Sequence, residues 1–155
     1  MPAGSDATGT TVPVRFRPLG VRIAAVILGA MLFLVSAVIW FAFPESVRDA
    51  FTILQRLTLL GFGLVALAAL HALGRSRVDA REDGLLAVNG YRTHQYSWND
   101  VAGVTLRAGG PWAILELADG TTAGAMGIQG SDGSRAVSQV KRLRVILAEH
   151  RTTQP

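Results

Sequence analysis

The sequence contains no cysteine, and its three histidines share no metal-ligand spacing. Without cysteine the chain forms no disulfide, and thiolate metal ligands and thiol nucleophiles are excluded as well. His71, His94 and His150 are far apart and follow no H-x-x-x-H pattern. A Ser-His-Asp set can be assembled only by free choice of residues that are scattered along the chain. We therefore expect a protein that is not an enzyme and that holds no cofactor or metal.

Charge is scarce in the first half of the chain. Residues 21–43 carry one charged side chain, Arg22, at their edge. At about 1.5 Å per residue this stretch extends about 34 Å as a helix, enough for a hydrocarbon core of about 30 Å. It is too long for the apolar core of a cleavable signal peptide. Trp40 and Phe41 near its far end are typical of a membrane interface, and Pro44 is expected to end the helix.

A second apolar stretch over residues 52–73 predicts another span, with Arg56 reaching toward the interface. Neither span has a central charge, which argues against a channel or transporter. Small residues at helical spacing favour close packing of the spans: Ala25, Gly29, Gly63 and Ala66. Three arginines lie at the start of the first span (Arg15, Arg17 and Arg22), and two lie at the loop between the spans (Arg48 and Arg56). Three more follow the second span (Arg75, Arg77 and Arg81). This bias predicts a hairpin over residues 15–74 in the cell membrane, with both termini cytoplasmic.

The two ends of the chain carry no apolar periodicity. Residues 1–14 are rich in Gly, Ser, Thr and Ala, and we expect them to form a disordered tail. Residues 152–155 form a short tail at the other end.

Turn signals recur through residues 75–133, which favours a small antiparallel β structure. The predicted strands are residues 77–82, 85–88, 91–98, 101–107, 112–118 and 121–128. Asn89-Gly90 is expected at the centre of a hairpin turn, because both residues tolerate positive φ. Alternation along the third strand places Tyr96 and Trp98 on one face.

The glycines at 124, 127, 130 and 133 lack the Lys-Ser/Thr of a phosphate loop, so they predict a flexible loop.

In the final segment the spacing of apolar residues changes from that of a strand to that of a helix. Ala136, Val140, Leu143 and Leu147 form one apolar stripe of a helix, and Ser131, Asp132 and Ser134 are candidate caps. The stripe is expected to cover the sheet, which makes residues 75–151 one domain.

The motifs of this segment resemble the bacterial PH-like (pleckstrin homology) domain family. The resemblance rests on Asp83-Gly84-Leu85, on Trp98-Asn99-Asp100-Val101-Ala102-Gly103-Val104 and on Leu115-Glu116-Leu117-Ala118-Asp119-Gly120. It implies a membrane hairpin followed by a small, mainly-β barrel or sandwich capped by a C-terminal α-helix. It also implies that Trp98 is buried and that Asp100 accepts backbone hydrogen bonds. The structural motif residues are Asp83, Gly84, Asn89, Gly90, Trp98, Asp100, Asp119 and Gly120. The family fold has seven strands, so either residues 125–129 hold the seventh or an edge is frayed.

The expected function is a non-catalytic, membrane-anchored interaction or scaffold module at the cytoplasmic face. It would bind an unknown protein partner or assemble with itself, and an exposed strand edge is one route. Trp112 is a partner contact, enters the membrane interface or packs under the helix. The alternative is recognition of anionic membrane lipids by basic residues: Arg75, Arg77, Arg135, Lys141, Arg142 and Arg144. The basic helix, which also carries Arg151, otherwise contacts the sheet or has a solvated face. The turn Glu82-Asp83-Gly84 is acidic, which argues against a phosphoinositide site, and we expect no nucleic-acid or small-molecule partner.

Overall fold

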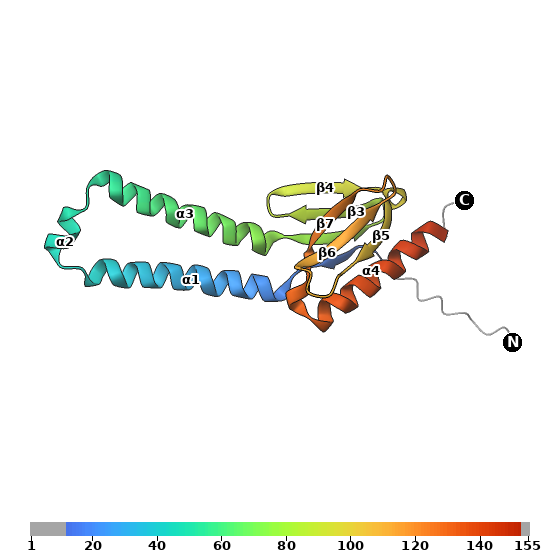
Figure 1. Ribbon diagram of the computed structural model, residues 1–155, viewed down its shortest axis with the longest axis horizontal. Helices are drawn as coiled ribbons and strands as arrows, with labels where there is room; N and C mark the ends of the chain where they lie inside the picture. The colour runs from blue at the N-terminus through green and yellow to red at the C-terminus, as the bar shows by residue number, and fades with distance from the viewer. Residues whose placement is uncertain (1–11, 153–155) are drawn as a thin grey trace. The chain divides into compact units, whose positions relative to one another are not determined.

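The computed structural model describes residues 12–152, and the chain divides into two compact units. One unit is the helical hairpin Leu19–Arg75. The other, called the β-domain below, combines residues 12–18 with residues 76–152. Figure 1 gives the order of the helices and strands. Residues 1–11, most of the predicted N-terminal tail, and residues 153–155 lie outside the described part of the chain.

The hairpin consists of α1 (Leu19–Ala42), the short α2 (Glu45–Ala50) and α3 (Ile53–Arg75). Both long helices are long and apolar enough to cross a membrane, and none of either apolar window is buried within the structure. Their bounds agree closely with the predicted spans at 21–43 and 52–73. Pro44 separates α1 from α2, as its missing N–H and fixed φ favour.

Arg56 is oriented toward the loop that joins the long helices. Its guanidinium donates hydrogen bonds to the carbonyl oxygens of Phe51 at 3.1 Å and Arg48 at 2.6 Å. It also lies 5.6 Å from the centre of the Trp40 ring, within cation–π range. The side chain of Arg56 therefore reaches toward the end of the span, as predicted.

Only one of the two predicted glycines lies where the helices meet. A Cβ on Gly29 would lie 3.6 Å from Leu67 and 3.7 Å from Leu70, so α3 packs directly over this position. Gly63 has open space around it. Small residues favour close helix packing in lipid, but spacing alone does not identify which of them face the partner helix.

A strand that the sequence analysis missed precedes the hairpin. β1 (Val14–Phe16) pairs antiparallel with β2 (Arg77–Arg81), in the register Val14↔Ala80, Arg15↔Asp79 and Phe16↔Val78. Val14 and Phe16 belong to the buried core. The predicted tail therefore ends before Val14, the hairpin begins at Leu19 rather than at residue 15, and the β-domain is discontinuous in sequence.

β1 also supplies the seventh strand. The remaining strands are β3 (Gly84–Asn89), β4 (Arg92–Tyr96), β5 (Val101–Thr105), β6 (Trp112–Leu117) and β7 (Thr122–Gln129). They form one sheet in the order β1-β2-β3-β4 and a second in the order β5-β6-β7. Residues 125–129 are part of β7 and not a separate strand. The predicted hairpins and fold class are confirmed.

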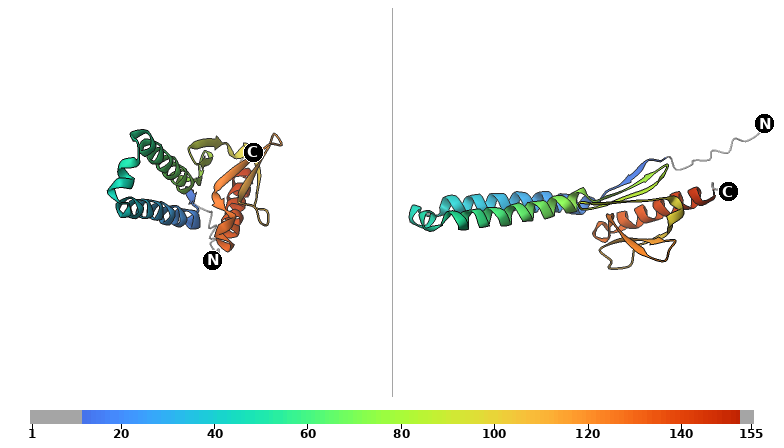
Figure 2. Two further views of the ribbon diagram at one scale, coloured as in Figure 1. Left: turned by 60° about the vertical axis from the view of Figure 1, so that its left-hand side comes forward. Right: turned by 90° about the horizontal axis from the view of Figure 1, so that it is seen from above.

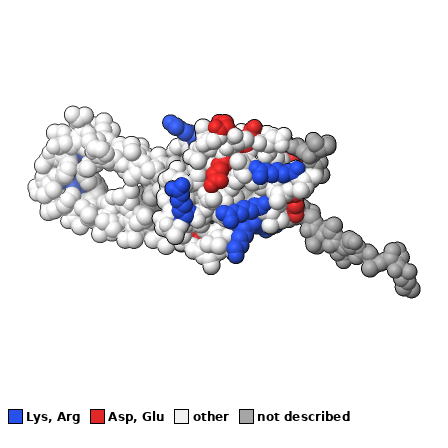
Figure 3. All heavy atoms as spheres, turned by 45° about the vertical axis from the view of Figure 1, so that its right-hand side comes forward, with Lys and Arg blue, Asp and Glu red and all other residues white. Residues whose placement is uncertain are grey.

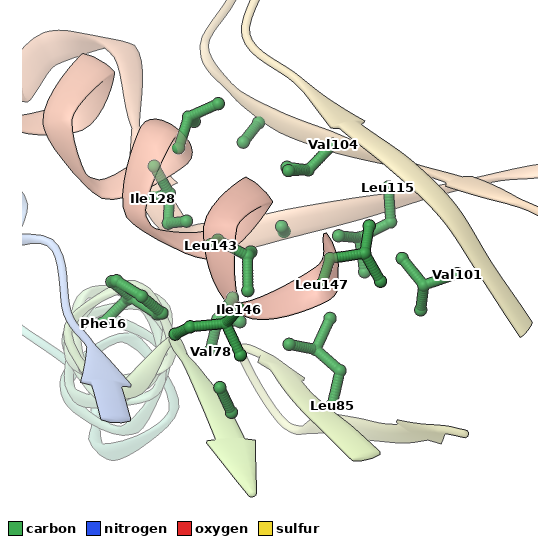
Figure 4. Close-up of a cluster of buried hydrophobic side chains, with 14 of the residues drawn as sticks. Phe16, Val78, Leu85, Val101, Val104, Leu115, Ile128, Leu143, Ile146 and Leu147 are labelled. Carbon is green, nitrogen blue, oxygen red and sulfur yellow. The ribbon is translucent and has the colours of Figure 1, made fainter. Parts of the chain in front are cut away.

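The C-terminal helix α4 (Ser134–Thr152) fills the space between the sheets. The predicted stripe of Ala136, Val140, Leu143 and Leu147 is buried, together with Ile146. Figure 4 shows Leu143, Ile146 and Leu147 between Val78 and Leu85 of the first sheet and Val101, Val104 and Leu115 of the second. The views in Figure 2 show α4 running alongside the strands. Burial of this one face is what orders the helix against the sheets.

The predicted flexible glycine loop is instead ordered structure. Gly124 and Gly127 lie in β7, and Gly130 begins the short 3-10 helix η2 (Gly130–Asp132). A Cβ on Gly127 would lie 2.4 Å from the backbone of Arg77 and Val78, so β7 crosses β2 in direct backbone contact. Only glycine permits this approach. Gly133, at φ +58°, precedes α4.

Candidate functional site at the sheet edges

One edge of the second sheet is covered by two arginines of α4. Arg144 donates from Nε to the Val104 carbonyl oxygen at 2.8 Å. Arg151 donates to the carbonyl oxygens of Val101 and Ala102, both at 2.8 Å. These acceptors lie on β5, the outer strand of its sheet. An edge strand with satisfied acceptors is a poor template for another strand, so this edge is closed.

A groove of about 330 Å³ lies between β5 and α4. Its charged lining residues are Arg144, Arg151 and Glu116. The hydroxyl of Thr105 donates to Glu116 Oε1 at 3.2 Å, so the carboxylate is held at the wall of the groove. The groove thus offers polar contacts to a small group of a ligand. Within residues 12–152, no group of three or more acidic or histidine side chains is placed to hold a metal ion.

The edge of the first sheet at β4 is open. β4 pairs with β3 alone among the described strands. Its first four side chains, from Arg92 to Gln95, are exposed on both faces of the sheet, and Tyr96 is half-buried. Gln95 donates to Asp83 Oδ2 at 3.0 Å, and the rings of His94 and Tyr96 stack at 6.3 Å. Local contacts therefore hold this strand extended while its outer backbone edge faces outward.

An ion cluster that the sequence analysis missed ties β1 to β2. Asp79 is 3% exposed, yet it points away from the core residues Val78 and Ala80. Its oxygens lie 2.8 Å from Arg15 Nε, 3.1 Å from Arg77 Nε and 3.8 Å from an Arg81 nitrogen. Arg77, Asp79 and Arg81 alternate along one strand, a period-two signal that could have identified the cluster.

Trp98 and Asp100 have the roles that the family resemblance implies. Trp98 is buried, and its indole N–H donates to the carbonyl oxygens of Arg81 at 3.1 Å and Glu82 at 3.3 Å. Its ring stacks on His150 at 4.4 Å. Asp100 accepts the backbone N–H of Ser97 at 3.1 Å. One detail differs, because β4 ends at Tyr96 and Trp98 begins a 3-10 helix, so the two aromatics do not share one strand.

The two glycine turns at the ends of β3 differ from the prediction. Asn89 is the last residue of β3 and pairs with Arg92, so Gly90 and Tyr91 form the turn. Asn89 uses its side chain to reach β7, donating to the Gly124 carbonyl at 2.6 Å and accepting from the Met126 N–H at 3.0 Å. Asp83 lies in the turn before Gly84, where a Cβ on Gly84 would clash with the Tyr96 carbonyl.

The Asp119-Gly120 turn joins β6 to β7 and is held by Thr121. The hydroxyl and the backbone N–H of Thr121 donate to Asp119 Oδ1 at 2.7 Å and 2.8 Å. These bonds stabilise the carboxylate and lower the pKa of Asp119, the hydroxyl contributing most. Gly120 has a φ of +82°, which favours glycine. These contacts have a structural role, because they fix the shape of the turn.

Trp112 packs on a glycine rather than under the helix. A Cβ on Gly124 would lie 3.0 Å from Trp112 Nε1, so the ring covers this position of β7. The neighbouring Ala113 is the residue that faces the core, and Trp112 is half-buried. Part of the Trp112 ring is therefore accessible, as the partner-contact prediction requires. The rest of the ring packs against β7.

The six predicted lipid-contact residues differ in their surroundings. Arg135, Lys141 and Arg142 are exposed on α4, whereas Arg144 is bonded to β5 and Arg77 to Asp79. Arg75 ends α3, in the other unit. Figure 3 shows Lys and Arg side chains gathered on one face of the β-domain. The acidic turn at Glu82-Asp83 also proves to be the second connection of the domain, because the first, between β1 and β2, is the helical hairpin itself.

Comparison with known proteins identifies the domain. Residues 75–145 match the family described as Bacterial PH domain. The chain contains a bacterial PH domain. The match begins at the end of α3, so it leaves out β1, which completes the first sheet of the PH domain. No solved structure matches the chain.

Relatives occur in mycobacteria. Uncharacterized protein Rv1417 of Mycobacterium tuberculosis and Uncharacterized protein Mb1452 of Mycobacterium bovis are each 34% identical over 89 residues. The matched part covers 57% of this chain and 58% of each relative. The chain therefore spans less than two thirds of the relatives that it matches.

Proposed function

We propose that this chain is a non-catalytic, membrane-anchored interaction module whose PH domain binds a protein strand at the open edge of β4. The strand comes from a partner protein or from a second copy of the chain. The observation that carries the proposal is the difference between two edge strands, β5 of the second sheet and β4 of the first. Arginines fill the acceptors of β5, while the outer edge of β4 is available for backbone pairing.

The hairpin supplies the anchor. Its apolar side chains are exposed in the structure, and a bilayer is the environment that removes such a surface from water. β1 and β2 pair in one sheet, so the two ends of the hairpin lie on the same side of the membrane that the helices cross. The arginine bias around the spans favours the cytoplasm for that side. Confinement to a membrane raises the effective concentration of weak partners.

Site-specific crosslinking tests the proposal, and the lack of native cysteine makes each introduced thiol unique. Thr93→Cys places a thiol on β4, and Thr122→Cys places a matched exposed thiol at the start of β7. In native membranes, T93C is expected to crosslink to one defined species and T122C to give monomer. A species of twice the monomer mass identifies self-assembly, and another mass identifies a partner. If T93C gave only monomer under several crosslinking chemistries, the proposed binding edge would be wrong.

A second candidate function rests on the exposed face of α4. Arg135, Lys141 and Arg142 lie on this helix beside Val137 and Val145, which are 48% and 50% exposed. Cations beside apolar side chains favour an anionic lipid surface. Because the PH domain includes β1, a fragment from residue 75 onward lacks a strand, and the full chain is needed for the test.

The lipid function is tested with an environment-sensitive dye on Val137→Cys, in nanodiscs of anionic or neutral lipid. Binding of α4 to lipid predicts a blue-shifted emission in anionic nanodiscs that is lost as salt screens the charges. The same dye on Thr122→Cys is the control. Equal emission in both kinds of nanodisc would contradict this second function.

A further inference from the structure

The two long helices enclose a groove of about 650 Å³ at the end of the hairpin where α1 begins and α3 ends. Each helix contributes one face. Arg22, Ile23 and Val26 of α1 and Leu70, His71 and Gly74 of α3 follow helical spacing and line the groove. Its volume lies within the range of pockets that hold small ligands.

The groove is apolar along its length and closes at Gly29. There Leu67 and Leu70 come within 3.6 Å and 3.7 Å of the position that a Cβ would occupy. From Arg22 to Gly29 the helix rises about 10 Å, which is about two thirds of the hydrocarbon depth of one leaflet. The dimensions and walls therefore fit the upper part of an acyl chain, entering from the surface of the membrane.

Two cationic side chains lie at the mouth of the groove. Arg22 and Arg75 line it, with His71 one helical turn from Arg75 on the same face of α3. The hairpin contains two acidic residues, Glu45 and Asp49, and both belong to α2 at the opposite end. A second copy of the chain would bring the same two arginines to this mouth, so like charge disfavours it as the occupant.

We infer that this groove binds one anionic phospholipid, with its phosphate between Arg22 and Arg75 and an acyl chain along Ile23, Val26 and Leu70. Guanidinium groups hold phosphate oxygens through charge-assisted hydrogen bonds, and the apolar walls exclude water from the chain. The inference rests on the proposed membrane anchoring of the hairpin. It is independent of the partner edge at β4 and of the outer face of α4.

The charge of the mouth is tested by native mass spectrometry of the full chain released from nanodiscs that contain phosphatidylglycerol and phosphatidylcholine. The wild type is expected to retain phosphatidylglycerol selectively. The double variant Arg22→Gln/Arg75→Gln is expected to lose about 25-fold in this selectivity, about fivefold for each cation removed. Arg48→Gln, in α2, is the matched control and should behave as the wild type. Unchanged selectivity in the double variant would overturn the inference.

The shape of the groove is tested separately. Gly74 lines it and has no atom within 4 Å of its Cβ position, so Gly74→Leu adds a side chain where the lipid lies. Gly61, on the same helix, is equally open but does not line the groove, so Gly61→Leu is the control. G74L is expected to lose bound lipid and G61L to retain it, whereas equal retention would overturn the inference. Failure of the anchoring itself is distinguishable, because carbonate would then wash the wild-type chain from membranes.

Discussion

The pairing of β1 with β2 makes Phe16 a core residue of the PH domain, although it precedes the hairpin in sequence. Its side chain is 3% exposed and packs in the buried cluster with Val78 and Ile146. Truncation of a buried Phe to Ala costs about 3–5 kcal/mol, and a site on a short edge strand relaxes more easily than the centre of a core. We therefore expect Phe16→Ala to lower the free energy of unfolding of the PH domain by about 3 kcal/mol.

Pulse proteolysis in urea, on the full chain in nanodiscs, measures this free energy. Val145→Ala is the control, because Val145 is 50% exposed on α4 and its truncation should cost less than about 0.5 kcal/mol. A domain of about 5–15 kcal/mol stability makes a loss of about 3 kcal/mol readily measurable. If Phe16→Ala cost no more than the control, residues 14–16 would not belong to the core, and the discontinuous PH domain would be refuted.

Three further outcomes follow from the contacts of the β-domain. Gly127→Ala is expected to destabilise the domain by about 2 kcal/mol in the same assay, because its Cβ would lie 2.4 Å from the backbone of Val78. A loss below about 0.5 kcal/mol would contradict the close crossing of β7 over β2. Arg151→Ala frees two carbonyl oxygens of β5, so we expect a loss of about 1 kcal/mol and faster amide exchange in α4 and β5; unchanged exchange would show that the arginine does not hold this edge. Thr121→Val is expected to raise the pKa of Asp119 toward its usual value of 3.8, measured by NMR titration. In the wild type, the lowered pKa of Asp119 stabilises the folded state at pH values above the pKa that Asp119 has in the unfolded chain. This stabilisation is lost as the pH falls through the pKa of Asp119 in the folded state. An unchanged pKa in the variant would contradict the role of the Thr121 hydroxyl.

The elements that could be predicted are those whose signals are local. The turn at Asp119-Gly120, the stripe from Ala136 to Leu147 and the long apolar runs each lie within a short window of sequence. Turn chemistry and periodicity therefore identified the hairpins, the final helix and the spans. The family resemblance added the burial of Trp98 and the backbone contact of Asp100, and the structure has both.

The elements that were missed depend on contacts between distant residues. β1 has three residues, and its partner Asp79 lies 64 positions after Arg15. Nothing near Val14 in the sequence distinguishes a strand from a tail. Gly127 was interpreted as flexible because its real constraint, the backbone of β2, lies far away in sequence.

The candidate site was predicted only in part, for the same reason. Arg144 and Arg151 lie seven residues apart on one side of α4. The basic excess of this segment predicted contact with the sheet, with anionic lipid or with solvent, and these two arginines contact the sheet. The carbonyl oxygens that they cover belong to β5, which no helical pattern could indicate. The open edge at β4 likewise follows from the order of the strands in the sheet, which the sequence did not specify.

The most direct test of the central claim is a disulfide across the hairpin. Val14→Cys/Ala80→Cys joins direct partners of β1 and β2, and Val14→Cys/Val78→Cys joins diagonal neighbours that lie too far apart. A protease site is added to the loop between α1 and α3. After oxidation and cleavage, the account predicts that the V14C/A80C fragments stay linked until reduced, while those of V14C/V78C separate. Separation of the V14C/A80C fragments without reductant would contradict a PH domain built from both sides of the hairpin.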